Sequence, residues 1–204
     1  MIKLDFCFKG KRTYVHGTDI FDKSLEHIAS ELQHLNKISV EMTFHGIASK
    51  NLNLIADQDL SDTVDQENLK STISLRSGEQ DLSYVLVQDH RPITCTVPYR
   101  EEDIIEASHL NLPDKSIEIK KPTGYSLIEQ AVAMNKELLK NLFPEAPGKW
   151  YFTKIKLRGI DLDKWLNKEY KFTIKFRKNL GFKLTDSLVY ADGNRLGNIY
   201  FSLS

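Results

Sequence analysis

The sequence has little cysteine. Cys7 and Cys95 are the only two thiols among 204 residues, they lie far apart, and they form no CxxC pair. Two such residues are too few for a disulfide scaffold, and their spacing does not fit the common metal and redox motifs. We therefore expect both cysteines to be reduced and to behave as small buried apolar residues.

Long apolar runs are absent as well. No stretch approaches the roughly 20 apolar residues that a helix needs to cross a bilayer. The sequence begins MIKLD, which lacks the uninterrupted apolar segment of a signal peptide. These absences predict a cytoplasmic protein with no membrane partner.

Several motifs with well-defined chemistry are also missing. There is no GxGxxG after a strand, no GxxxxGK[ST] phosphate loop, no GxSxG elbow and no HExxH. The missing motifs argue against dinucleotide binding, nucleoside triphosphate binding and ordinary serine-hydrolase catalysis. We expect no cofactor. His27, Glu31 and His34 share one face of a predicted helix at metal-ligand spacing, but that face lies opposite the apolar stripe. We expect it to face solvent and to bind no metal.

Charge of neither sign is in excess, because 28 basic side chains balance 28 acidic ones. A neutral total argues against binding nucleic acid or an anionic membrane through bulk charge. The balance is uneven along the chain: residues 1–112 hold 11 Lys/Arg and 18 Asp/Glu, whereas residues 113–204 hold 17 and 10. The two halves could attract each other, or the second could offer a basic face to an acidic partner.

The first half has the pattern of a strand, a helix and further strands. Residues 2–8 alternate apolar and polar side chains, as in a half-buried strand. A helix follows, with Thr18 or Asp19 as its cap and apolar residues at helical spacing. Its stripe is Phe21, Leu25, Ile28 and Leu32. Strands are predicted at 38–47, 50–55, 72–77 and 82–88, and then a turn at 89–92 and a last strand to Val97.

The second half repeats this order. A strand is predicted at 116–120, and a helix follows whose apolar stripe is Leu127, Ala131, Met134, Leu138 and Leu142. Further strands are predicted at 150–157, 170–177, 182–190 and 198–203, with a turn at 192–194. Gly78 and Asp89 recur as Gly181 and Asp192 at one offset of 103 residues. The sequence therefore predicts two units, residues 1–112 and 113–204, each with a helix on a sheet.

This order resembles the hotdog fold, in which a curved antiparallel sheet wraps a central helix. The resemblance is strongest from Tyr151 to Ser204, where FTKIKL and YKFTIKFRKNLGFKLTDSLVYADGNRLGNIYFSL look like the closing strands of hotdog 3-hydroxyacyl-carrier-protein dehydratases. It implies an α+β fold of two tandem hotdog units, each a long helix packed on a curved antiparallel sheet. The VH pair before the first helix is also similar to the A-factor-synthase hotdog family.

Two residues match the dehydratase acid/base pair. In that family a His precedes the helix of one unit and a Glu or Asp lies on the helix of the other; here His16 stands in YVHGTD and Glu129 in TGYSLIEQAVA. The resemblance implies that His16 removes the α-proton while Glu129 helps the β-hydroxyl to leave. The sequence departs from the family in lacking its Gly-His-Phe-Pro-Gly stretch and a proline before Gly124, and in placing the helix-motif Gln at Gln130.

The function that the resemblance implies is the handling of acyl thioesters, most directly as a hydro-lyase of the 3-hydroxyacyl thioester dehydratase type. The implied substrate or partner is an acyl carrier protein or an acyl-CoA, and the resemblance also allows a homodimer. A hotdog thioesterase is the nearest alternative. Another is a non-catalytic hotdog that binds an acyl carrier or a protein partner.

Both candidate residues also have structural interpretations. Ser126 and Glu129 form the S-x-x-E pattern of a capping box, which satisfies free N–H groups at a helix start. Helical geometry also places Glu129 on the side of Lys136 and Lys140, where it could simply face water. His16 could bond a backbone carbonyl or shape the turn with Gly17.

Basic and aromatic residues alternate late in the chain. Phe172, Phe176 and Phe182 lie among lysines and an arginine, a mixture that single-stranded nucleic acid could use. A strand with one buried aromatic face and one solvated basic face gives the same pattern, and we expect no nucleic-acid partner. The basic second half suits an acidic acyl carrier protein better.

Overall fold

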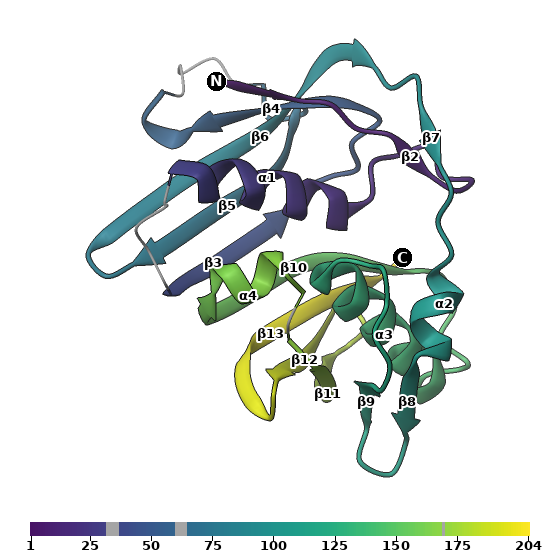
Figure 1. The fold of residues 1–204 in the computed structure, drawn as a ribbon. Helices are drawn as coiled ribbons and strands as arrows, with labels where there is room; N and C mark the ends of the chain where they lie inside the picture. Colours follow the sequence, from purple (N-terminus) through teal and green to yellow (C-terminus); the bar gives the residue numbers. More distant parts are fainter. Residues whose placement is uncertain (32–36, 60–64, 169) are drawn as a thin grey trace. The chain divides into compact units, whose positions relative to one another are not determined.

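The computed structural model describes residues 1–31, 37–59, 65–168 and 170–204 and divides the chain into two compact units, unit 1 (Met1–Tyr99) and unit 2 (Arg100–Ser204) (Figure 1). Helices and antiparallel sheets occur in both, so the fold is α+β, as predicted. With this division unit 1 holds 10 basic and 14 acidic side chains and unit 2 holds 18 and 14. No helix of the described residues is long and apolar enough to cross a membrane.

Unit 1 combines a long helix with an antiparallel sheet whose strand order is β1-β4-β6-β5-β3. Its elements are β1 (Ile2–Leu4), β2 (Phe8–Lys9), α1 (Gly17–Glu31), β3 (Lys37–Phe44), β4 (Lys50–Ala56), the 3-10 turn η1 (Asp57–Asp59), β5 (Leu69–Ser77), β6 (Gln80–Pro92) and β7 (Thr96–Val97). The predicted helix is confirmed: Phe21, Leu25 and Ile28 are at most 1% exposed, whereas Leu32 and His34 lie outside the described residues. The helix begins at Gly17, so Thr18 and Asp19 lie in its first turn and do not cap it.

The prediction of two reduced cysteines is wrong. Cys7 and Cys95 form a disulfide across a sequence separation of 88 residues. Strand β2 pairs in parallel with β7, and the Phe8 N–H donates to the Cys95 carbonyl over 3.0 Å, which brings the two sulfurs together. Disulfides are rare in the cytoplasm, because reducing compartments keep thiols reduced. The disulfide therefore argues against the predicted cytoplasmic location, which stays a prediction.

The predicted turn at 89–92 is also wrong, because β6 continues through it. The Asp89 carboxylate accepts the Arg91 N–H over 2.7 Å and pairs with the Arg91 guanidinium, which also pairs with Asp5. The Asn51 side chain donates to the Pro92 carbonyl over 3.1 Å and accepts the Phe6 N–H over 2.7 Å. These side chains satisfy the local polar groups without a chain reversal, and the bond to Phe6 interrupts the strand predicted over residues 2–8.

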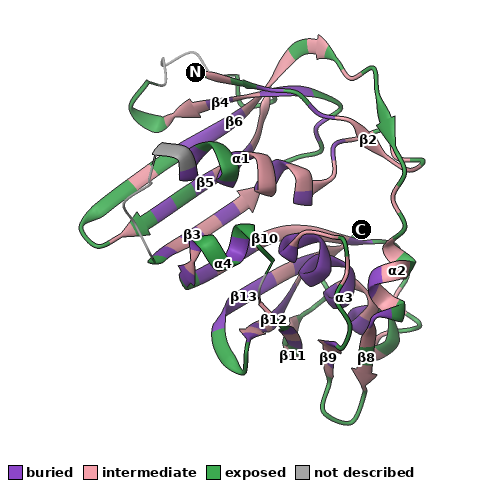
Figure 2. Ribbon diagram, in the orientation of Figure 1, coloured by how far each residue is buried: buried purple, intermediate pink, exposed green. Residues whose placement is uncertain are grey.

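Unit 2 places α3 (Leu127–Leu142) on an antiparallel sheet whose strand order is β10-β13-β12-β11-β9-β8. The other elements are α2 (Glu101–Glu106), β8 (Ser108–Asn111), β9 (Ser116–Ile119), β10 (Trp150–Asp161), α4 (Leu162–Leu166), β11 (Phe172–Leu180), β12 (Leu184–Ala191) and β13 (Asn194–Leu203). Figure 2 shows most of α3 as buried, and Leu127, Met134 and Leu138 are at most 1% exposed. The predicted apolar stripe is confirmed as far as Leu138, whereas its last member, Leu142, is half-buried.

The two units have related but not identical connectivity. In each sheet a strand that precedes the long helix (β1 or β9) and the first strand after the helix (β3 or β10) lie apart, and the later strands lie between them. The order of those later strands differs, because it is β4-β6-β5 in unit 1 and β11-β12-β13 in unit 2. Gly78 and Gly181 are both at hairpin tips, with φ of +57° and +62°. Asp192 lies in the predicted turn, whereas Asp89 lies within β6. Each unit therefore has a strand, a long helix and an antiparallel sheet in the order that the hotdog resemblance implies, but the repeat extends neither to the strand order within the sheets nor to the last hairpin.

Candidate functional site

His16 directly precedes α1 in unit 1. Its carbonyl accepts the N–H groups of Asp19 and Ile20, at 2.9 and 3.3 Å, and so begins the helix. Its ring Nδ1 lies 2.6 Å from the Thr18 hydroxyl oxygen, and Thr18 is fully buried. The ring also lies 5.5 Å from the ring of Tyr99, centroid to centroid. The imidazole is thus held on two sides at the N-terminal end of a long helix.

Cations surround the Tyr99 ring beside His16. The Lys9 ammonium lies 5.0 Å and the Arg12 guanidinium 5.1 Å from the ring centroid. Lys9 also pairs with Asp19 in the first turn of α1, and both of these side chains are less than a fifth exposed. Cations and the positive end of a helix both favour negative charge nearby. The surroundings of His16 therefore suit a group on which negative charge develops.

Glu129 lies in the first turn of α3 in unit 2 and is 8% exposed, so it does not face water. The Ser126 N–H donates to its Oε2 over 2.8 Å, and the Glu129 N–H donates to the Ser126 hydroxyl over 3.2 Å. The capping box is confirmed. Tyr125, directly before the cap, donates its hydroxyl hydrogen toward the Arg100 carbonyl and the Asp103 carboxylate, at 2.9 and 3.0 Å. Burial raises the pKa of Tyr125, and the Asp103 carboxylate adds to that rise.

His16 and Glu129 belong to different units, so the acid/base pair stays a prediction. Within the described residues no group of three or more His, Cys, Asp or Glu could hold a metal ion. His27 is exposed, while the Glu31 side chain and His34 lie outside what the structure describes.

Most of the basic and aromatic stretch forms β11, which has two faces, whereas Phe182 lies in the turn after the strand and is 36% exposed. Phe172 is fully buried and Phe176 is half-buried, whereas Lys175 and Lys178 are exposed. Phe176 and Phe182 each pack edge-to-face on Phe143, at 5.4 and 5.3 Å between centroids. The aromatic residues therefore contribute to packing, as the structural interpretation predicts.

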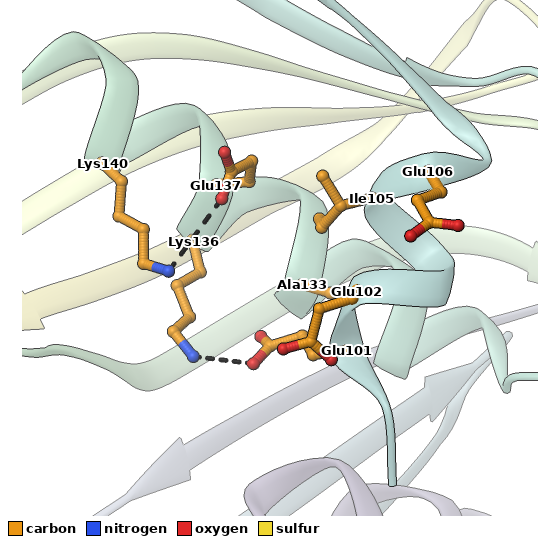
Figure 3. Close-up of a pocket in the computed structure, with 8 residues that line it drawn as sticks. All are labelled: Glu101, Glu102, Ile105, Glu106, Ala133, Lys136, Glu137 and Lys140. Carbon is orange, nitrogen blue, oxygen red and sulfur yellow. Dashed lines mark hydrogen bonds and ion pairs between the residues drawn. The ribbon is translucent and has the colours of Figure 1, made fainter.

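Unit 2 has a groove of about 200 Å³ between α2 and α3 (Figure 3). Ala133 and Ile105 give it an apolar part, and the Lys136 ammonium pairs with Glu101 over 2.8 Å. Glu102 and Glu106 add two carboxylates from α2. The groove is therefore acidic and poorly suited to an anionic ligand.

A second cavity of unit 2, of about 340 Å³, has the opposite charge. Lys120 and Lys121 line it from the end of β9, and Lys168 and Lys171 line it from the segment after α4. Gln130, from the first turn of α3 and next to Glu129, also lines it. The basic second half of the sequence signalled this charge, but the two lysine pairs lie too far apart in the chain for their convergence to be seen there.

No protein-family model matches the sequence, and no curated protein matches it either. Among solved structures, the chain is similar to a tesB protein of Mycobacterium avium subs paratuberculosis, with 10% identity, a TM-score of 0.49 and coverage of 96% of this chain and 88% of that one. The pyran synthase domain from module nine of the sorangicin pathway is similar with 10% identity and a TM-score of 0.48, and the match covers 97% of this chain and 91% of that one. The dehydratase domain of a mycocerosic acid synthase-like PKS is similar with 8% identity and a TM-score of 0.49, and the match covers 94% of this chain and 83% of that one. At this level of similarity none of them assigns a reaction to this chain.

Proposed function

We propose that this protein acts on acyl thioesters as a dehydratase of the 3-hydroxyacyl type, with His16 as base and Glu129 as acid. One observation carries the proposal. The two long helices have corresponding places in their units, and the N-terminal end of one has an imidazole while the first turn of the other has a buried carboxylate. Elimination of water from the α- and β-carbons of a 3-hydroxyacyl thioester needs a base and an acid, and these two side chains can supply them.

The chemistry assigns one task to each residue. His16 takes the α-proton, and the contact of its Nδ1 with Thr18 fixes the orientation of the ring for that step. The electron pair left on the α-carbon forms the double bond as the β-hydroxyl departs with a proton from Glu129, so the products are an enoyl thioester and water. Negative charge that develops on the thioester oxygen is stabilised by Arg12 and the positive end of α1, since the charge of Lys9 is already balanced by Asp19.

The capping box favours a second candidate, a non-catalytic hotdog that binds an acyl carrier or another protein. In the structure the Glu129 carboxylate accepts the Ser126 N–H, which is a sufficient structural reason for a glutamate at this position. In this alternative the carboxylate transfers no proton, and binding occurs without turnover.

The test follows interconversion of 3-hydroxyacyl and 2-enoyl thioesters, on carrier protein and on CoA, by mass spectrometry. We expect His16→Ala and Glu129→Gln each to lower kcat/KM by about a hundredfold or more. Gln still offers an acceptor to the Ser126 N–H, so Glu129→Gln keeps the cap and tests the proton alone. His27 is an exposed histidine of α1, the helix that His16 directly precedes, so His27→Ala is the matched control and should be fully active.

The outcomes separate the candidates. Absence of turnover with every thioester, or undiminished turnover in both variants, refutes the dehydratase. Release of free thiol without dehydration identifies a thioesterase. A rise in melting temperature on adding carrier protein, without turnover, favours the binding module.

A further inference from the structure

The basic cavity of unit 2 has features of an anion site. It lies between the end of β9, the first turn of α3 and the segment that follows α4. Its volume of about 340 Å³ lies within the range of small-molecule sites. Beyond the lysines it is lined by Gln130 and Thr123. The Gln130 amide donates one hydrogen to the Tyr125 carbonyl over 3.1 Å and has a second to donate, and the Thr123 hydroxyl accepts the Tyr125 N–H over 3.4 Å and keeps its own hydrogen. The cavity therefore combines positive charge with hydrogen-bonding groups in a concave place.

Its positive charge is only partly neutralised. Lys120 and Lys171 share a single carboxylate, that of Glu118, at 2.6 and 3.7 Å. The Lys168 ammonium donates to the Gly124 carbonyl over 2.9 Å, which carries no net charge. Lys121 makes no ion pair within the described part of the chain. Among the described residues, which do not include Glu169, four ammonium groups thus line the cavity beside the carboxylate of Glu118. A concave surface of one sign concentrates ions of the other sign.

The backbone at Lys168 is unusual. Its φ is +60°, and its N–H donates to the Trp165 carbonyl over 3.1 Å as α4 ends. Glycine is the common residue in this left-handed position after a helix, since it adopts a positive φ without steric cost. Lys168 has this steric cost, but its side chain places an ammonium group at the cavity, which a glycine could not do.

We infer that this cavity binds a phosphate ester, and that in the proposed function it holds the phosphate end of the pantetheine arm that carries the acyl group. This assignment of the arm rests on the proposed function, whereas the anion site does not. Ammonium groups bind phosphate as point charges, and side-chain amide and hydroxyl groups can donate to its remaining oxygens. Gln130 lies in the first turn of α3, where the helix dipole adds a further preference for negative charge.

Calorimetric titration of the full chain tests the inference. The probes are 4′-phosphopantetheine, pantetheine without its phosphate, CoA and inorganic phosphate. We expect 4′-phosphopantetheine to bind at least about tenfold more tightly than pantetheine, inorganic phosphate to compete with it, and added salt to weaken it. The double variant Lys121→Ala/Lys168→Ala should remove the difference between the two pantetheine compounds. Lys178→Ala, an exposed lysine of β11, is the control and should preserve it.

Three results overturn the inference: equal affinity for pantetheine and its phosphate, unchanged affinity in the double variant, or binding of CoA without binding of 4′-phosphopantetheine. The last result would mean that the nucleotide part of CoA is recognised. Because titration needs no turnover, phosphate-dependent binding with a negative dehydratase assay leaves the site standing and removes the reaction. If thioesters with and without the phosphate are turned over equally, by the wild type and by the double variant, the reaction stands and the phosphate site is refuted.

Discussion

The two units have the same order of elements but hold the start of their long helix by different means. In unit 1 the segment before α1 is tied to the segment after β6 by the Cys7–Cys95 disulfide and by the pairing of β2 with β7. In unit 2 the start of α3 is held by local hydrogen bonds between Ser126 and Glu129. The shared order of a strand, a long helix and further strands therefore does not determine how a candidate residue is fixed at the helix end. In unit 1 a covalent link between distant segments does so, and in unit 2 a contact between residues three positions apart.

Breaking the disulfide should give the largest difference between the units. We expect Cys7→Ser/Cys95→Ser to lose about 4 kcal/mol of stability in unit 1, since a bond that closes so long a loop restricts the unfolded chain strongly. Both tryptophans, Trp150 and Trp165, belong to unit 2. Guanidinium unfolding followed by far-UV circular dichroism should shift markedly, and tryptophan fluorescence should shift less. Equal shifts of both signals would contradict the idea that the bond supports unit 1 in particular.

Removing the cap of α3 is the counterpart in unit 2, with a smaller effect. Ser126→Ala should cost about 1 kcal/mol, since it leaves the Glu129 N–H without its acceptor at a helix start. Ser126→Thr keeps a hydroxyl acceptor and should recover most of that loss. The measurement is urea unfolding followed by tryptophan fluorescence. If the alanine and threonine variants are equally stable, the hydroxyl contributes nothing and the contrast between the units is wrong.

What could be predicted from the sequence differs between the units for a physical reason. The stripe and the capping box of α3 are local patterns, in which residues three or four positions apart meet on one turn, and the structure has both of them. The disulfide depends on β2 and β7 meeting across most of unit 1, and no spacing rule reports such a contact. The basic cavity could not be predicted for the same reason, because its lysines come from two segments that are distant in the sequence.

The error at residues 89–92 has a different origin. Asp, His, Arg and Pro together are typical of a turn, because their side chains and the fixed proline ring favour chain reversal. In the structure those preferences are met along an extended chain, where Asp89 bonds the Arg91 backbone and Asn51 bonds Pro92. Proline is tolerated there because Pro92 is the last residue of β6, next to an irregular point in its pairing with β4. Tertiary contacts overrode a local preference.

The smallest expected effect concerns Glu118, whose carboxylate pairs with two lysines of the basic cavity. The Lys120 ammonium, by its hydrogen bond and its charge, and Lys171 more weakly, hold the pKa of Glu118 below its ordinary value of 4.5. A lowered pKa in the folded state means that the ionised carboxylate stabilises the fold above that ordinary value, and that this contribution is lost as the pH falls through the lowered pKa. The side chain is a third exposed, so solvent screening limits the contribution to less than about 1 kcal/mol.

Glu118→Gln should therefore reduce stability slightly at neutral pH and not at all in acid below the folded-state pKa, in urea unfolding measured across that range. The same change removes the carboxylate that Lys120 and Lys171 share. We expect it to tighten the binding of 4′-phosphopantetheine about threefold, which corresponds to roughly 0.6 kcal/mol. A variant that loses stability at neutral pH and binds the phosphate more weakly would show that Glu118 organises the lysines for the ligand. One that tightens binding as expected would show that it competes with the ligand for them.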